Sequence, residues 1–164
     1  PGVVSLTGKN GLEIQSTLAR QLALYVALYS PIQMAADLPE HYAARPDAFQ
    51  FIKDVAVDWD ESRVLAGEVG EFVAIARKQR GIEQWFVGAI NDRNPRDLRL
   101  QLDFLDAGKR YRAEVYRDGE GAGWKGDARF RFVRETREVA RGDAMHLWLA
   151  GGGGAAVRFV PVEG

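Results

Sequence analysis

The stretch RQLALYVALYSPIQMAAD, residues 20–37, decides the fold of this chain. Its first half has the pattern of a helix that is apolar nearly all the way round, with one stripe formed by Leu18, Leu22, Tyr25 and Tyr29. A helix with so little polar surface packs between two layers of a protein. Pro31 ends this helix, because the proline ring disfavours the α conformation at Ser30.

The residues after the proline predict a strand and then a second helix. Ile32–Ala36 is a short apolar run typical of a buried strand, and Asp37 stands at its carboxyl end. A loop over residues 37–46 leads to a helix over Asp47–Asp54, with Asp47 as its cap. A buried helix, a buried strand and a second helix are what the last turn of a (β/α)8 barrel contains.

After about Trp59 the sequence predicts short strands instead of helices. Residues 57–70 are expected to cross between two domains, and strands at the short spacing of a β-sandwich follow. The predicted strands are Glu71–Lys78, Gln84–Asn91, Leu98–Phe104, Lys109–Tyr116, Ala128–Arg134, Ala144–Leu149 and Ala155–Val160. The first two are apolar on both faces, which predicts that both faces of their sheet are covered.

We therefore expect an α+β chain made of two parts. Residues 1–56 form a helix–strand–helix remnant of a (β/α)8 barrel, and residues 57–164 form an antiparallel β-sandwich. Ser16 or Thr17 is expected to cap the first helix. The run Gly151–Gly154 is interpreted as a turn, and it is the one low-complexity patch of the sequence.

Composition excludes several classes of protein. The chain has 164 residues, of which 46% are hydrophobic and 27% charged, the proportions of an ordinary globular protein. A net charge of -1 gives no general attraction to nucleic acid, and the absence of cysteine excludes disulfides and thiolate metal sites. The longest nearly apolar run, Leu22–Tyr29, is far shorter than the roughly 20 residues that a membrane span needs.

Motifs that carry catalysis or bind metal are missing from the sequence. His41 and His146 stand outside any HExxH pattern, and no Gly-x-Ser-x-Gly turn presents a nucleophile. The most calcium-like patch is the acidic cluster of Asp54, Asp58, Asp60 and Glu61. A calcium loop starting at Asp58 needs Gly and Glu where Arg63 and Val69 stand. We predict no catalytic residue and no metal ligand here, and a solvated or salt-bridged connector at the cluster.

The basic run from Arg129 to Arg141 is the one feature that resembles a nucleic-acid strand, because Phe130 and Phe132 are interleaved with arginines. Strand alternation places both phenylalanines on the core face and Arg129 with Arg131 on the opposite face. We therefore interpret the run as a solvated strand face and expect no nucleic-acid partner.

Two residues are candidates for contact with a substrate. Asp37, at the end of the predicted barrel strand, would lie on the rim where barrel active sites are built, and the alternative is a carboxylate that caps a loop or helix. Trp124, in the glycine-rich loop GEGAGWKGD, is the tryptophan best placed to stack on a sugar ring. The alternative for Trp124 is a hydrophobic plug.

Long stretches of the chain resemble the carboxyl-terminal part of glycoside hydrolase family 97. They are STLARQLALYVALYSPIQMAADLPEHY, DAFQFIKDVAVDWDESRVLAGEVGEFVAIARK, WFVGAINDRNPRDLRLQLDFLDAGKRYRAEVYRDG and GGGGAAVRF, in the family's order over nearly the whole chain. The family contains bacterial α-glucosidases and α-galactosidases built from an amino-terminal β-sandwich, a (β/α)8 barrel and a carboxyl-terminal β-sandwich.

The resemblance implies that residues 1–56 are the end of the catalytic barrel and residues 57–164 the last domain. The family's catalytic carboxylates, and the calcium of its inverting members, belong to segments upstream of Pro1, so this chain itself is expected to hold no cofactor. The implied partners are the remainder of the parent barrel and, in the full enzyme, an α-linked oligosaccharide. A periplasmic or secreted location is also implied.

The first hypothesis for function is therefore the carboxyl-terminal fragment of an α-glycoside hydrolase, which supports the barrel and is inert alone because hydrolysis needs two carboxylates at a fixed separation. A non-catalytic carbohydrate-binding β-sandwich is the alternative, and a purely structural adaptor is a third reading of residues 57–164. In an isolated fragment, we expect the exposed apolar helix Leu22–Tyr29 to favour a homodimer.

Overall fold

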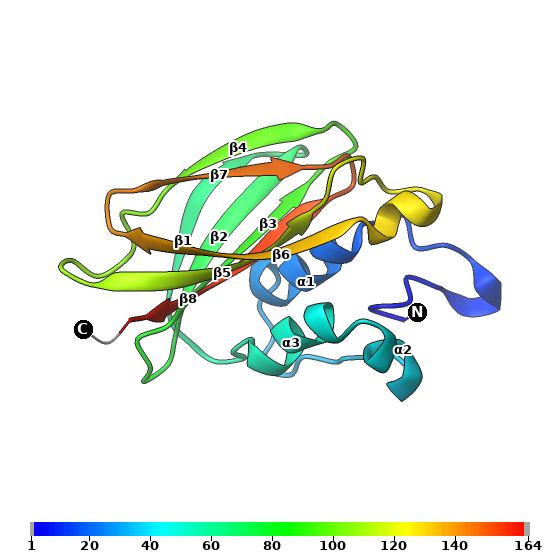
Figure 1. The fold of residues 1–164 in the computed structure, drawn as a ribbon, viewed down its shortest axis with the longest axis horizontal. Helices are drawn as coiled ribbons and strands as arrows, with labels where there is room; N and C mark the ends of the chain where they lie inside the picture. Colours follow the sequence, from blue (N-terminus) through cyan, green and yellow to red (C-terminus); the bar gives the residue numbers. More distant parts are fainter. Residues whose placement is uncertain (1, 163–164) are drawn as a thin grey trace.

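The computed structural model describes residues 2–162, in which a β-rich body carries a small group of helices on one side (Figure 1). The helices are α1 (Leu18–Ala27), α2 (Pro39–Ala44) and α3 (Pro46–Asp54), with 3-10 turns at Lys9–Gly11 and Gly126–Phe130. The strands are β1 (Trp59–Glu68), β2 (Phe72–Gln79), β3 (Trp85–Asn91), β4 (Arg96–Gln101), β5 (Arg110–Asp118), β6 (Phe132–Ala140), β7 (Ala144–Leu149) and β8 (Gly154–Pro161).

The strands form two antiparallel sheets. Six of them make a sheet in the order β1-β2-β3-β8-β5-β6, and β4 pairs with β7 in a second, two-stranded sheet. The last strand therefore enters the middle of the large sheet, where β8 pairs with β3 on one side and with β5 on the other. β1 pairs only with β2 and is an edge strand, and its register shifts between Val64 and Ala66.

The first hydrophobic core lies between the two sheets. Aromatic residues of the large sheet and of the loop after β4 meet there, with Phe104 packed against both Trp85 and Phe159. The alternating residues of β4 and β7 supply the opposite wall, namely Leu98, Leu100, Met145, Leu147 and Leu149. A β-sandwich results, as the strand pattern predicts.

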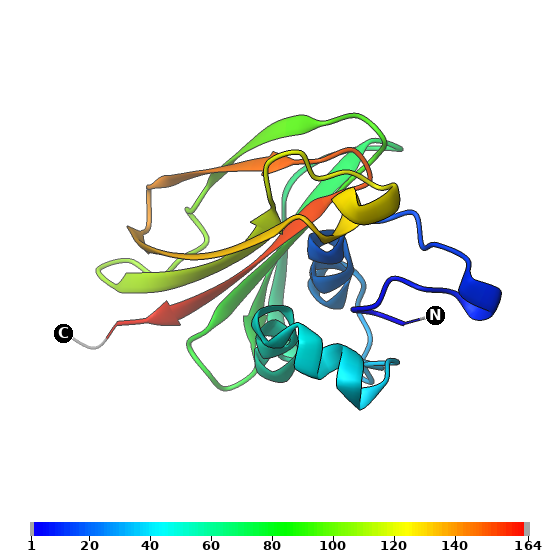
Figure 2. The same cartoon turned by 45° about the vertical axis from the view of Figure 1, so that its right-hand side comes forward.

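The second core lies on the other face of the large sheet, under the helices. Leu22, Val26 and Phe51 pack there against Phe86 and Tyr116 of the sheet. Figures 1 and 2 both show α1 lying against the strands on the side away from β4 and β7. The large sheet is thus covered on both faces, which confirms the expectation from its doubly apolar strands, and the second cover is a helix of the same chain.

Glycines in β3 and β8 let α1 pack close to the backbone of the large sheet. A Cβ atom at Gly88 of β3 would lie 2.5 Å from the carbonyl oxygen of Ala23, and one at Gly154 of β8 would lie 2.9 Å from the Cα of Arg20. Both distances are too short for any larger residue without a shift of the helix. The hydroxyl oxygen of Thr17 caps α1 by accepting from the Arg20 amide, as expected for this position.

The segment Ile32–Ala36 is not a strand in this structure, contrary to the sequence prediction. It pairs with no strand of the described residues, although the Val3 amide donates to the Ala36 carbonyl at 3.3 Å. The side chains of Ile32 and Met34 are 77% and 76% exposed. It is tied to α1 by the Tyr25 hydroxyl, which donates to the Met34 carbonyl. A buried strand needs neighbouring strands to satisfy its backbone, and residues 2–162 supply no strand at this place.

Other element boundaries also differ from the prediction. β1 occupies most of the predicted connector over residues 57–70, and α2 lies within the predicted loop over residues 37–46. The predicted strand Ala128–Arg134 is a 3-10 turn in its first half, and the predicted strand Leu98–Phe104 ends at Gln101. α3 begins at Pro46 rather than at a capping Asp47, since proline is favoured in the first helical turn.

Candidate functional site

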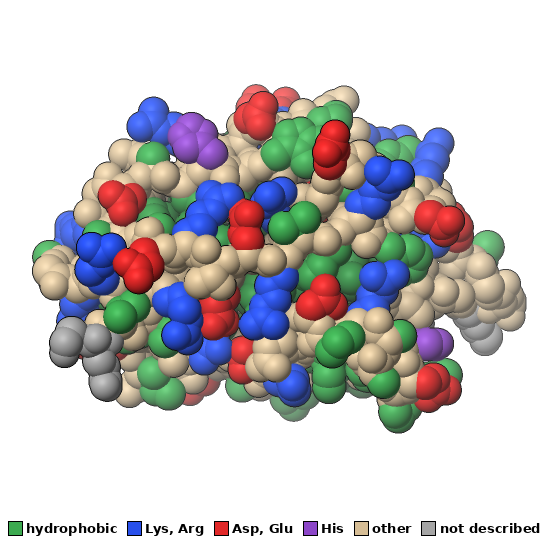
Figure 3. All heavy atoms as spheres, in the orientation of Figure 1, with side chains coloured by type: hydrophobic (Ala, Val, Ile, Leu, Met, Phe, Trp, Pro, Cys, Tyr) green, Lys and Arg blue, Asp and Glu red, His purple; other side chains and the backbone are tan. Residues whose placement is uncertain are grey.

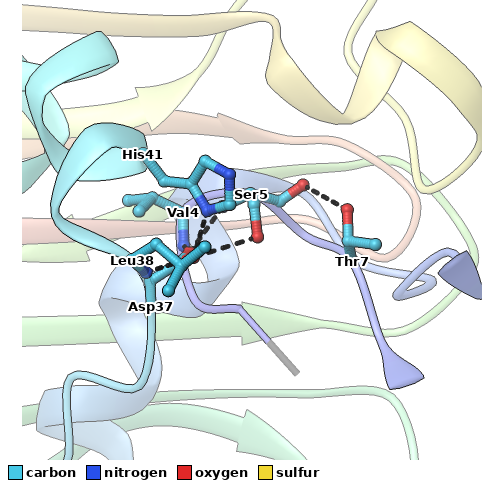
Figure 4. A network of polar contacts seen from close by, with 6 residues as sticks. All are labelled: Val4, Ser5, Thr7, Asp37, Leu38 and His41. Carbon is cyan, nitrogen blue, oxygen red and sulfur yellow. Dashed lines mark hydrogen bonds and ion pairs between the residues drawn. The ribbon is translucent and has the colours of Figure 1, made fainter. Parts of the chain in front are cut away.

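The carboxylate of Asp37 is the centre of a polar network that joins the amino-terminal segment to the start of α2 (Figure 4). Its Oδ2 accepts hydrogen bonds from the amides of Val4 and Ser5, both at 2.8 Å. Its Oδ1 accepts from the Leu38 amide at 2.9 Å and lies 2.5 Å from Nδ1 of His41, on α2. Asp37 therefore holds the amino-terminal segment against the start of α2.

The electrostatics of this network keep Asp37 ionised. Burial alone would raise the pKa of Asp37, but the hydrogen bonds from Ser5, His41, Leu38 and Val4 outweigh it and lower the pKa to about 2. An ionised carboxylate can only accept hydrogen bonds, so in the contact between Asp37 and His41 the proton is on Nδ1 of His41, which donates. The pair fixes the orientation of the imidazole, whose side chain is 41% exposed.

The network leaves Asp37 little capacity for a ligand. Its side chain is 2% exposed, and the Ser5 hydroxyl donates to it in addition to the four contacts above. Gly2 closes the remaining side, where a Cβ atom would lie 2.7 Å from both carboxylate oxygens. This geometry is that of a carboxylate that caps backbone amides, so a substrate-binding role for Asp37 stays a prediction.

Trp124 lies at a second hollow, of about 620 Å³, which shares no lining residue with the hollow at Asp37. The indole is half-buried and packs on the backbone of Gly152, where a Cβ atom would lie 2.5 Å from the Trp124 Cβ. The Lys125 ammonium and the Arg93 guanidinium lie 4.3 and 5.5 Å from its ring centre. A sugar that stacks on a face covered by either cation has to displace it.

The acidic cluster is neutralised by arginines. Arg80 pairs with Asp58 at 2.7 Å and with Asp60 at 3.1 Å, and Arg158 pairs with Asp54 at 2.9 Å. The Arg80 side chain holds the pKa of Asp58 below its ordinary value, mainly through their hydrogen bond. The described residues contain no group of three or more acidic, histidine or cysteine side chains placed to hold a metal ion.

Arg129 is buried, contrary to the prediction from the sequence. It was expected on a solvated strand face, but it lies in the 3-10 turn before β6 and is 6% exposed. Its guanidinium donates to the carbonyls of Leu6 and Ile14 and pairs with Glu13, so it clamps the amino-terminal segment to the β-sandwich. The alternation of Arg and Phe predicted a strand and gave no signal of this turn.

The charged groups of the sheet surface are paired and mixed in sign. Figure 3 shows acidic and basic side chains interspersed over the face formed by β5 and β6. Arg117 pairs with Glu135 and Arg110 with Glu138 across these two strands. Such a face offers no continuous positive surface to nucleic acid. The longest helix of the described residues has ten residues, and none is long and apolar enough to cross a membrane.

Exposed apolar side chains concentrate where α1 ends. The segment from Leu28 to Leu38 carries five of them, with exposed fractions between 54% and 77%, namely Leu28, Tyr29, Ile32, Met34 and Leu38. We call this set the 28–38 surface. The helix itself is different: Leu22 and Val26 are 0% exposed because the sheet covers them, so the expectation that this helix is exposed was wrong. A homodimer through Leu22–Tyr29 stays a prediction, with only the end of that range exposed.

Comparison with known proteins identifies the source of this architecture. A family model described as "Glycosyl-hydrolase 97 C-terminal, oligomerisation" matches residues 58–160. The chain belongs to glycoside hydrolase family 97. It is 36% identical over 145 residues to a retaining alpha-galactosidase of Bacteroides thetaiotaomicron, a match that covers 88% of this chain and 21% of that protein.

Solved structures of family 97 show the same fold at high similarity. A family 97 enzyme from Pseudoalteromonas sp. strain K8, solved as a variant in complex with panose, is 47% identical with a TM-score of 0.93. That match covers 99% of this chain and 26% of the enzyme. A beta-arabinopyranosidase is similar at a TM-score of 0.74 and 27% identity, over 92% of this chain and 22% of that chain. The chain spans about a fifth to a quarter of its relatives and corresponds to the carboxyl-terminal part of a family 97 glycoside hydrolase.

Proposed function

We propose that this chain is the non-catalytic end of an α-glycoside hydrolase of the α-glucosidase or α-galactosidase type. Residues 1–56 complete the last turn of the catalytic (β/α)8 barrel, and residues 57–164 support it as a β-sandwich. The barrel strands that pair with Ile32–Ala36, the catalytic carboxylates and any calcium ligands are assigned to the rest of the parent enzyme, in a periplasmic or secreted location.

The 28–38 surface is the observation that carries this proposal. Its five large apolar side chains lie beside a well-packed helix, on a segment that has no strand partner in residues 2–162. Burying such side chains contributes roughly 1.5–3 kcal/mol each, so their exposure is costly unless another part of the enzyme covers them. In a barrel, a parallel strand on either side would satisfy the backbone, and the layers on the two faces of the sheet would cover the side chains.

The Asp37 network fits a supporting role. It fixes the loop after Ile32–Ala36 against the amino-terminal segment, so this run is held at its end by a saturated carboxylate. Tyr25 holds the middle of the run through the Met34 carbonyl. The segment is thus restrained at its middle and at its end before any neighbour pairs with it, which lowers the entropy cost of docking.

Two measurements test the proposal. The purified chain is expected to release no nitrophenol from nitrophenyl α-glucoside or α-galactoside, and addition of the separately produced amino-terminal part of the enzyme is expected to restore turnover of one of them. Charged replacements on the 28–38 surface, Ile32→Asp with Met34→Asp, should weaken this complementation by about tenfold or more. Turnover by the chain alone, or full complementation by the charged variant, would contradict the proposal.

A carbohydrate-binding module is the second candidate, favoured by one observation. Trp124 lines its hollow together with the planar polar side chains of Gln15, Asp92, Arg93 and Asn94, which is chemistry suited to sugar hydroxyls. Calorimetric titration with maltose, melibiose and longer α-glucans decides between the candidates. Saturable heat that Trp124→Ala abolishes would support a module, and absence of heat would leave the supporting role alone.

A further inference from the structure

His41 carries an imidazole that is held at one ring nitrogen and open at the other. Its Nδ1 lies 2.5 Å from Oδ1 of Asp37, whose carboxylate is itself fixed by backbone amides on both sides of the contact. Figure 4 shows Nε2 on the side of the ring away from Asp37, and among the described residues Nε2 has no hydrogen-bond partner. Where a buried carboxylate bonds to one nitrogen of an imidazole, that bond orients the other nitrogen towards a ligand or substrate.

The hollow beside His41 is lined by hydroxyl groups. Its volume is about 430 Å³, and Ser5 and Thr7 line it together with His41. The Ser5 hydroxyl donates to the Asp37 carboxylate at 3.3 Å, and the Thr7 hydroxyl donates to the Ser5 carbonyl at 3.1 Å. Each hydroxyl has thereby used its one donor and keeps lone pairs with which to accept. A few fixed polar groups around a hollow are what a sugar, with hydroxyls on every side, requires.

Chain order places this hollow on the catalytic face of the proposed barrel. The active site of a (β/α)8 barrel is built from the loops that follow the carboxyl ends of its strands. In the proposed barrel Ile32–Ala36 is the last strand, so residues 37–46 form the loop after it. Residues 2–16 precede α1, the helix before that strand, and so belong to the loop after the preceding strand. The hydrogen bonds of Asp37 join these two loops, as expected of neighbours on one face.

We propose that His41 binds a sugar hydroxyl of the α-linked substrate through Nε2, at the rim of the active site of the full enzyme. Asp37 is then a positioning residue, which holds the imidazole without touching the sugar. A sugar hydroxyl both donates and accepts, so it can bond to Nε2 in either protonation state of the ring. The inference rests on the proposed barrel-supporting function and goes further, because it assigns a substrate contact to the chain.

A purely structural bond between α2 and the loop before it is the competing explanation. It uses only Nδ1 of His41, because that nitrogen alone reaches Asp37. Asparagine separates the two explanations, since its side-chain amide can donate from about the position of Nδ1 but has no atom at the position of Nε2. His41→Asn therefore keeps the structural bond and removes the substrate-facing nitrogen.

Steady-state kinetics of the full-length parent enzyme test the inference, on a nitrophenyl glycoside and on an α-linked oligosaccharide that it hydrolyses. We expect His41→Asn to lower kcat/KM about fivefold or more on at least one of them, mainly through a higher KM. Asp37→Asn should lower kcat/KM as well, and the double variant should lose no more than His41→Asn, because Asp37 acts through His41. Glu40→Gln is the matched control, since Glu40 is exposed on the same helix and does not line the hollow.

An unchanged kcat/KM in folded His41→Asn on both substrates would overturn the inference, and so would an equal loss in Glu40→Gln. Circular dichroism monitors folding. Where His41→Asn unfolds, His41→Gln and His41→Ala replace it: glutamine can place its amide near the position of Nε2 and should retain more of kcat/KM, and equal losses would contradict the sugar contact. Complementation of the purified chain tests the barrel-supporting function separately, so normal complementation with an unaffected His41→Asn enzyme would overturn this inference alone.

Discussion

Replacement of Gly88 by alanine tests the packing of α1 on the sheet. The added Cβ would lie 2.5 Å from the Ala23 carbonyl oxygen, 2.9 Å from the Val26 Cβ and 3.0 Å from the Ala27 nitrogen. Ordinary contact begins near 3.4 Å, so the helix has to move away by about 1 Å. Because two of these three atoms are backbone, a rotamer change cannot relieve the contact.

The expected cost is about 2 kcal/mol in the free energy of unfolding. Overpacking of a core typically costs roughly 1–3 kcal/mol, and this contact belongs at the upper end because it meets backbone atoms. Alanine recovers roughly 0.4–1 kcal/mol because it restricts the unfolded chain more than glycine does, which leaves about 2 kcal/mol. For a domain of this length, each kcal/mol shifts the Tm by roughly 2–4 °C. Gly88→Ala should therefore lower the Tm by about 4–8 °C.

Calorimetry and urea unfolding of Gly88→Ala provide the assay, with Gly123→Ala as the matched control. A Cβ at Gly123 meets only the Ala128 Cβ at 4.0 Å, so this variant should keep the wild-type stability or gain slightly. A Gly88→Ala protein within about 0.5 kcal/mol of wild type would refute the close approach of α1 to β3.

Three further predictions follow from the polar contacts. The hydrogen bonds to Asp37 outweigh its burial and lower its pKa from 3.8 to about 2. Asp37 therefore stabilises the fold above about pH 4, and this stabilisation is lost as the pH falls towards 2. In urea unfolding, Asp37→Asn should therefore cost roughly 2 kcal/mol at pH 6 and progressively less below pH 4, and a pH-independent difference would contradict this. Arg129→Gln should lower the free energy of unfolding by roughly 2–4 kcal/mol and speed proteolysis within residues 6–14, because the buried carbonyls of Leu6 and Ile14 lose a charged donor. Unchanged proteolysis would show that Arg129 does not hold this segment. Arg80→Ala, by contrast, should leave the urea midpoint close to that of wild type despite its two ion pairs, since all three side chains are largely exposed. A clear fall of the midpoint in the same urea assay would show a buried role.

Much of the fold could be predicted from local patterns. The alternation of Leu98 and Leu100 with charged residues predicted β4, and the doubly apolar sequence of β3 predicted a sheet covered on both faces. The sequence also predicted Thr17 as a cap of α1, because capping depends on residues that are close together in the chain. Of the candidate site, sequence alone singled out Asp37, and the geometry shows it capping Val4 and Ser5.

Features that depend on distant residues were decided only by the tertiary structure. Arg129 looked like a surface residue because its partners, Leu6 and Ile14, lie more than a hundred positions away. The run Gly151–Gly154 looked like low complexity, but Gly154 is where α1 meets β8.

The sequence by itself determined which segments are apolar, where helices and strands break, and which family the chain resembles. The tertiary structure decided which apolar surfaces are already covered. The apolar face of α1 packs against β3 and β8. Ile32 and Met34 remain exposed, because a strand cannot satisfy its backbone without neighbouring strands. The hydrophobic pattern of a sequence predicts that an apolar surface will be buried. Which segment buries it depends on which parts of the chain meet in the folded structure.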